Sequence, residues 1–433
     1  MGLIFTLIYV LYMYISPAAW IPWLATIRVQ PFVAGLACVW TLPRLLDHRP
    51  FKASPQLLLF MMFSAYLTMS PALQGWFGGV VAAVPGVAVP ALLLFLIPVN
   101  CDTILRRQIL VAALVVSMVG LVLPGIHDYY HPSDESKFLL RPWNDEEADS
   151  TEIQAPPGLD RLKAQGLIDD PNDFAQLLLV TTSLCFFWWS RKWLKNIFLV
   201  LLPAGILLYG VYLTHSRGAL VALAVMVAVA FRRKLRWLGS LAVAGVVALG
   251  LLANTFTGGR EINLSAAGGG DRLDIWSDGL QLLKSSPLVG KGYGGFSDAV
   301  EMTAHNSFLL VAVELGLPGL VLWVAVFVLC FYQIQRIVAP ADGAAPDPVL
   351  SQQAVCLEVA LTAFLATSWF LSRAYQPASF LLVGLLGGLV YQETLRRPGA
   401  VLMLPWRTCL IRSLVVSAAA VLMIYGVIRL RTF

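Results

Sequence analysis

The segment NSFLLVAVELGLPGLVLWVAVFVLCFYQI, residues 306–334, decides the class of fold, because Glu314 is its only charged residue. A bilayer core about 30 Å thick needs roughly 20 apolar residues in a helix, so this segment can span it. Comparable apolar runs lie at 3–19, 29–46, 56–70, 77–99, 108–124, 173–190, 194–213, 217–231, 235–253, 352–371, 378–395 and 410–428. We therefore predict an all-α, polytopic integral membrane protein with about 12 or 13 transmembrane helices, forming one membrane domain over residues 1–433.

Lysine and arginine residues gather in alternate connections between these runs. Short cytoplasmic connections are enriched in basic residues, so this set is predicted to face the cytoplasm. It holds more than half of the 30 basic residues: Arg44, Arg49, Lys52, Arg106, Arg107, Arg191, Lys192, Lys195, Arg232, Arg233, Lys234, Arg236, Arg336, Arg396, Arg397, Arg407 and Arg412. The net charge of +5 then reflects membrane orientation, and no nucleic-acid partner is expected. Arg429 and Arg431 oppose an outward C-terminus, which keeps the twelve-helix alternative open.

Two long loops, residues 125–172 and 254–305, are predicted to lie on the opposite, outer side. The first is mostly acidic; a solvated surface would explain it, and so would a lid or an acceptor-docking surface. Residues 159–168 are compatible with a short amphipathic helix there, and Asn172 or Asp173 suits the N-cap of the following span. In the second loop, Leu273, Trp276, Leu280 and Leu283 form an apolar stripe that predicts an amphipathic helix, and Asp271 suits its N-terminal cap.

The arginines on the predicted outer side include Arg217, Arg272 and Arg373, which we single out because they lie on different segments. An arginine there often only extends its charge towards the lipid headgroups. However, one guanidinium group can also donate two hydrogen bonds to phosphate oxygens at once. Three such groups on different segments could hold a diphosphate. His305 lies on the same side, and an imidazole can take up and return a proton near neutral pH. A helix cap is the alternative role for His305.

Three further residues are secondary candidates. His215 lies two residues from Arg217, and Asn306 follows His305 at the start of the long apolar run. Glu314 would be costly in a membrane without a partner, so we expect it to pair with an arginine in the bundle and to be structural first.

Cofactor and metal chemistry have no support in the sequence. The six cysteines avoid both long loops, and no CxxC or HExxH spacing occurs, so we expect neither a disulfide framework nor a metal site. The glycines at 286–296 lack the spacing of a nucleotide-binding loop.

Five short sequence motifs, taken in their order along the chain, resemble the O-antigen ligase and polymerase family. They are Thr214-His215-Ser216-Arg217-Gly218, Arg272-Leu273-Asp274-Ile275-Trp276, Ser286-Pro287-Leu288-Val289-Gly290-Lys291-Gly292, His305-Asn306-Ser307-Phe308-Leu309 and Glu314-Leu315-Gly316-Leu317-Pro318-Gly319. The resemblance covers about residues 172–395. The remainder of the chain is similar to the family only in hydropathy.

The resemblance implies a GT-C-like glycosyltransferase in the bacterial inner membrane, with its active site facing the periplasm. It would move a glycan from undecaprenyl diphosphate to an acceptor, without cofactor or metal. Arg217 and Arg272, helped by Arg373, would bind the diphosphate, and His305 would activate the acceptor hydroxyl. A single displacement would invert the anomeric centre.

Lipopolysaccharide biosynthesis, with transfer onto lipid A-core, is the expected role, and polymerisation of a surface polysaccharide or protein O-glycosylation are the alternatives within the family. Two rivals of other classes are a flippase for lipid-linked glycans and a non-catalytic assembly component. A flippase should show internal repeats with broken helices, and no convincing repeat is found in the sequence.

Overall fold

The computed structural model describes residues 1–27, 29–47, 50–133, 136–140, 160–257 and 270–431. Within them the chain is almost entirely helical, with one two-stranded antiparallel sheet, β1 (Leu139–Leu140) and β2 (Arg161–Leu162). The prediction of an all-α membrane protein is confirmed. The short helix expected at 159–168 is wrong, because Leu162 and Arg161 pair with Leu139 and Leu140 instead.

The helices of the first half include several short ones, although the helix Ile104–Tyr130 has 27 residues. They are α1 (Gly2–Ile15), α2 (Pro17–Trp20), α3 (Pro22–Thr26), α4 (Val29–Asp47), α5 (Pro50–Ala53), α6 (Pro55–Leu73), α7 (Phe77–Ala91), α8 (Leu93–Asn100), α9 (Ile104–Tyr130), α10 (Pro171–Cys185), α11 (Trp193–Asn196) and α12 (Leu202–Leu213). Three-residue 3₁₀ turns cover Gly166–Ile168 and Phe186–Trp188, and a π-helical turn, Ile197–Leu201, joins α11 to α12. The span predicted at 77–99 is divided between α7 and α8, next to Pro90.

The second half contains longer helices. They are α13 (Arg217–Thr257), α14 (Gly270–Ser285), α15 (Gly295–Val300), α16 (Ser307–Val338), α17 (Pro348–Ser368), α18 (Pro377–Arg396) and α19 (Trp406–Arg431). Helix α13 contains a kink at Arg236, close to the boundary predicted between the spans 217–231 and 235–253. Helix α14 is the amphipathic helix predicted from its apolar stripe, and it includes Asp271 in its first turn.

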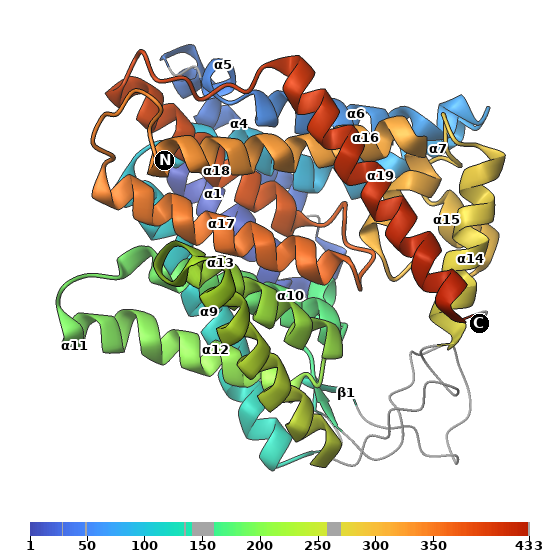
Figure 1. Cartoon of the computed structure of the whole chain (residues 1–433), viewed down its shortest axis with the longest axis horizontal. Helices are drawn as coiled ribbons and strands as arrows, with labels where there is room; N and C mark the ends of the chain where they lie inside the picture. Colours follow the sequence, from blue (N-terminus) through green and yellow to red (C-terminus); the bar gives the residue numbers. More distant parts are fainter. Residues whose placement is uncertain (28, 48–49, 134–135, 141–159, 258–269, 432–433) are drawn as a thin grey trace.

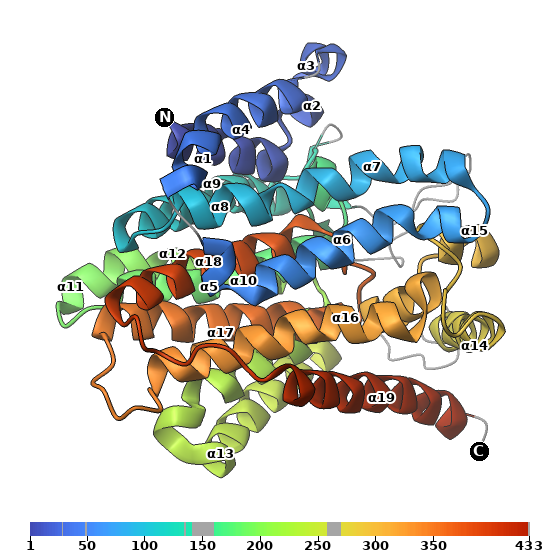
Figure 2. The same ribbon diagram turned by 90° about the horizontal axis from the view of Figure 1, so that it is seen from above.

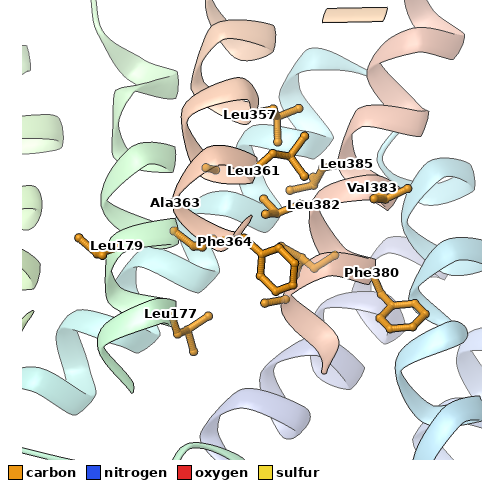
Figure 3. Close-up of a cluster of buried hydrophobic side chains, with 14 of the residues drawn as sticks. Leu177, Leu179, Leu357, Leu361, Ala363, Phe364, Phe380, Leu382, Val383 and Leu385 are labelled. Atoms are coloured by element: carbon orange, nitrogen blue, oxygen red, sulfur yellow. The ribbon is translucent and has the colours of Figure 1, made fainter. Parts of the chain in front are cut away.

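Helix α17 lies at the centre of the bundle and packs against α10, α13, α16 and α18 (Figures 1 and 2). Figure 3 shows part of the resulting core, where Leu177 of α10, Leu361 and Phe364 of α17, and Leu382 of α18 gather. All four side chains are buried, so these helices form one packed unit that can hold a site at its end.

Eight helices in the described part of the chain are long and apolar enough to cross a bilayer. They are Pro55–Leu73, Phe77–Asn100, Ile104–Tyr130, Trp193–Leu213, Ser307–Val338, Pro348–Ser368, Pro377–Arg396 and Trp406–Leu430. The other predicted spans also fall on helices, but α1 and α10 are shorter than the predicted runs. The protein is therefore polytopic, with eight spans identified by length and composition.

The two ends of the bundle carry different polar groups. We call the loop end the one where α9 finishes, α10 begins, and α14 and α15 lie. At the opposite end, predicted cytoplasmic arginines join buried carboxylates. Asp102 pairs with Arg44 (3.2 Å) and Arg106 (2.8 Å), and Glu358 pairs with Arg232 and Arg233. These ion pairs hold together helices that are far apart in sequence.

Candidate functional site at the loop end

The structure brings together the four residues that the sequence singles out. Arg217 begins α13, Arg272 lies in the first turn of α14, His305 precedes α16, and Arg373 lies between α17 and α18. Their charges act on one another: Arg272 and Arg373 both lower the pKa of His305, and Arg217 lowers that of Arg272. Four segments far apart in sequence thus build one cationic cluster, which we call the arginine cluster.

His305 is held as a neutral imidazole. Burial lowers its pKa to about 4, and the positive charges of Arg272 and Arg373 add to this shift, while Asp170 opposes it. Its backbone is in the left-handed region, at φ 47°, which is uncommon for a residue with a side chain. The Thr303 hydroxyl lies 3.3 Å from Nε2. At neutral pH this ring can therefore accept a proton.

Arg217 and Arg272 keep their guanidinium groups available. Arg217 is exposed and Arg272 is half-buried, and neither makes a hydrogen bond or an ion pair with another described residue. Burial lowers the pKa of Arg272, Asp170 opposes the shift, and Arg217 adds to it. Two neighbouring like charges that form no ion pair among the described residues favour an anionic ligand.

Arg373 differs from the other two arginines, because both its Nε and a terminal nitrogen donate to the Asp173 carboxylate. Asp173 is buried in the first turn of α10. Ser307, two residues after His305, connects to the turn that carries Arg373. Its hydroxyl accepts from the Arg373 backbone N–H (2.8 Å) and donates to the Leu371 carbonyl (2.6 Å). The turn with Arg373 is therefore fixed to the start of α16, two residues after His305.

We predict that Arg373→Ala destabilises the protein by about 1–3 kcal/mol, because it leaves the Asp173 carboxylate buried without its counter-ion. Arg373→Ala combined with Asp173→Asn should recover much of this loss. Thermal unfolding in nanodiscs, followed by tryptophan fluorescence, measures both variants. A double variant no more stable than Arg373→Ala alone would contradict the coupling.

His215 is part of the tight turn before α13 and has φ 50°. Its Nε2 lies 3.0 Å from the Tyr129 hydroxyl, and its ring packs against Tyr129 and Tyr212. Asn306 is buried and caps α16, with its Oδ1 accepting from the Leu309 N–H at 3.0 Å. Both residues thus shape the backbone beside the arginine cluster.

Glu314 does not pair with an arginine among the described residues, so that expectation is wrong. Its carboxylate instead accepts from the Gly294 N–H at 3.0 Å. The glycine segment, residues 286–296, runs beside a break in α16 at Gly316, with Lys291 N–H donating to Val313 O and Gly292 N–H to Glu314 O. A Cβ at Gly290 would lie 2.3 Å from the Glu314 carbonyl oxygen, so only glycine permits this approach.

Two polar residues near the cluster, Asp170 and Arg161, were not predicted as site residues. Asp170, which acts on both His305 and Arg272, caps α10 in place of the predicted Asn172 or Asp173. Arg161 is buried and donates to the Thr214 carbonyl (2.9 Å) and the Asn172 side chain (3.0 Å). It thereby joins the first long loop to the turn that precedes Arg217. Only the spacing of Asp170 before Pro171 could have indicated its capping role.

Comparison with known proteins gives two matches, each to part of the chain. Residues 202–324 match the family described as O-antigen ligase, and this range contains Arg217, Arg272 and His305 but not Arg373. The chain is also similar to the exopolysaccharide production protein ExoQ of Rhizobium meliloti (strain 1021), at 32% identity over 129 residues. That alignment covers 25% of this chain and 29% of the relative, so most of each protein lies outside it. The resemblance to the O-antigen ligase family is thus confirmed for the segment that supplies three of the four members of the arginine cluster.

Proposed function

We propose that this protein is an inner-membrane glycosyltransferase that moves a glycan from undecaprenyl diphosphate to an acceptor hydroxyl at the periplasmic face. The observation that carries the proposal is the meeting of a neutral His305 with Arg272, which Arg217 adjoins; neither arginine forms an ion pair with a carboxylate among the described residues, although Asp170 lies near enough to act on Arg272. The family match over residues 202–324 supports the same assignment.

The proposed reaction is one displacement at the anomeric carbon. The acceptor oxygen forms a bond to this carbon as the bond to the diphosphate oxygen breaks, and His305 takes the proton from the acceptor hydroxyl. Negative charge grows on the departing undecaprenyl diphosphate, where Arg217 and Arg272 would stabilise it more in the transition state than before. Attack opposite the leaving group inverts the anomeric centre. No step in this scheme calls for a metal.

Two versions of this function differ in the acceptor that receives the glycan. Transfer onto lipid A-core, an O-antigen ligase reaction, follows the family description. Extension of an exopolysaccharide on the lipid carrier is the second candidate, favoured by the name of the relative from Rhizobium meliloti. Purified protein in nanodiscs, supplied with lipid-linked glycan and either acceptor, tests both. Release of undecaprenyl diphosphate with a longer glycan product supports the proposal, and no product with either acceptor refutes it.

The proposed orientation has its own test. Asp298 is an exposed residue of α15, at the loop end, and Lys234 is an exposed residue of α13, two residues before its kink at Arg236 and in a connection predicted to be cytoplasmic. In a variant without native cysteines, a membrane-impermeant thiol reagent should label Asp298→Cys in cells with a permeable outer membrane and leave Lys234→Cys unlabelled. Labelling of position 234 alone would place the arginine cluster in the cytoplasm and rule out a periplasmic reaction.

The pH dependence follows from the low pKa of His305. Only the neutral ring can accept a proton, so activity is lost as pH falls through the pKa of about 4. Both phosphates of the donor are esterified and keep their charge in this range. We expect kcat/KM to stay level from pH 8 to about pH 5, whereas an ordinary histidine would give a decline near 6.5. A decline centred near 6.5 would contradict the burial of His305.

A further inference from the structure

A large cavity lies beside the arginine cluster and is not used by the chemistry above. Its volume is about 680 Å³, within the range of small-ligand sites, about 300–1,000 Å³. Its walls come from α1, the segment before α4, α7, the glycine segment and the turn between α17 and α18. Most of these elements lie outside the segment that matches the family.

One turn separates the cavity from the cluster. Ser372 and Gln376 line the cavity and flank Arg373 in sequence. Gln376 and Pro377 also line a second, small pocket that contains Asp173 and Arg373. A ligand in the cavity would therefore lie next to the turn that carries Arg373.

The described lining mixes many apolar side chains with a few polar ones. None of the described residues that line the cavity is acidic or basic. Tyr12, Tyr293 and Tyr375 present aromatic rings, and those of Tyr293 and Tyr375 pack 5.9 Å apart. The side-chain amides of Gln30 and Gln376 make no hydrogen bond with another described residue. Aromatic faces next to available amides suit a ligand with apolar faces and hydroxyl edges.

We propose that this cavity binds an uncharged stretch of sugar chain and holds it beside the arginine cluster. The proposal rests on the function proposed above and adds a substrate class to it. A polyprenyl tail would leave both amides desolvated without partners, which is unfavourable. A uronate or a phosphate would bury charge where the described walls offer no counter-ion. A neutral sugar avoids both costs.

Binding can be tested without catalysis. Saturation-transfer NMR on the full-length protein in nanodiscs would compare neutral oligosaccharides of glucose, galactose and N-acetylglucosamine with an oligosaccharide that contains uronic acid. We expect signals from a neutral oligosaccharide alone. Gln376→Glu and Tyr12→Ala should weaken its binding about tenfold or more, whereas Gln335→Glu, in a groove between α16 and α19, should leave it unchanged.

Gly86→Ala is a milder third variant. Alanine suits a helix interior, but its Cβ would lie 2.5 Å from the Tyr293 hydroxyl and push this ring into a new position. It should therefore fold and still weaken saccharide binding. Equal binding by wild type and all three cavity variants, binding of the uronate-containing chain as strong as that of the neutral chains, or no neutral saccharide bound at all would overturn the proposal.

Transfer kinetics then identify which substrate supplies the sugar. A higher KM for the lipid-linked donor in Gln376→Glu assigns the cavity to the donor glycan, and a higher KM for the acceptor assigns it to the acceptor glycan. A lower kcat with both KM values unchanged would count against sugar binding there. Saccharide binding by a wild-type protein that shows no transfer would refute the proposed function and leave the cavity assignment standing.

Discussion

Replacing His305 with alanine or asparagine should lower glycan transfer by about 10²–10⁴-fold, the usual loss when a general base is removed. Burial and the arginines keep this imidazole neutral, and the helix N-terminus that follows it also disfavours the protonated form. A neutral ring can take the proton of the acceptor hydroxyl, which neither replacement can do. Binding of the lipid-linked donor should persist, because the arginines remain. Initial rates and donor binding in nanodiscs measure the two effects separately.

Asparagine is the more informative replacement for His305, because it should remove the base without changing the backbone. His305 has φ 47°, and asparagine adopts such left-handed conformations more readily than most residues, so His305→Asn should keep the backbone turn. His215 provides the matched control, since it is also a histidine with positive φ, 50°, but it contacts Tyr129 and precedes Arg217. His215→Asn should cost far less activity. A His305→Asn protein with nearly wild-type turnover would place the base elsewhere and leave His305 as a structural residue.

The helices were largely predictable, because long apolar runs in a membrane protein have few alternatives to helix. Their interruptions were harder to predict. The run 77–99 contains Pro85 and Pro90, which are compatible with its division into α7 and α8. The break in α16 is different, because there Gly316 lies against the carbonyl of Leu288, a contact between distant segments. The sequence also placed the kink of α13 near Arg236, where basic residues interrupt the apolar run.

The members of the arginine cluster could be proposed because chemistry and predicted sidedness coincide in Arg217, Arg272 and His305. Their partners could not, since pairing depends on how helices pack. Asp173 was predicted as a possible helix cap and instead holds Arg373, while Asp170 makes the cap. Glu314 was expected to meet an arginine and instead meets the backbone of the glycine segment. In each case the residue type indicated a need for a partner without indicating which.

Replacing Arg217 or Arg272 should test the diphosphate site with an equally large effect. Alanine at either position should lower turnover by about 10²–10³-fold, as expected when a donor to the charge that develops in the transition state is lost. Lysine keeps the charge but loses the forked geometry that binds two phosphate oxygens, so its effect should be smaller and still clear. The exposed Arg412, on α19, is the matched control, and Arg412→Lys should leave turnover unchanged.

The kinetic constants of the lysine variants distinguish diphosphate binding by Arg217 and Arg272 from a role in anchoring the protein at the membrane surface. If the two arginines act on the departing diphosphate, Arg217→Lys and Arg272→Lys should lower kcat more than they raise the KM for donor, since the interaction strengthens as charge develops. Sugar-free undecaprenyl diphosphate should inhibit the wild type, and each lysine variant should weaken this inhibition. The wild-type protein already tolerates the repulsion between Arg217 and Arg272, and lysine adds no charge at either position. The double lysine variant should therefore fold normally. If that double variant turns over donor at the wild-type rate, Arg217 and Arg272 only anchor the protein at the membrane surface.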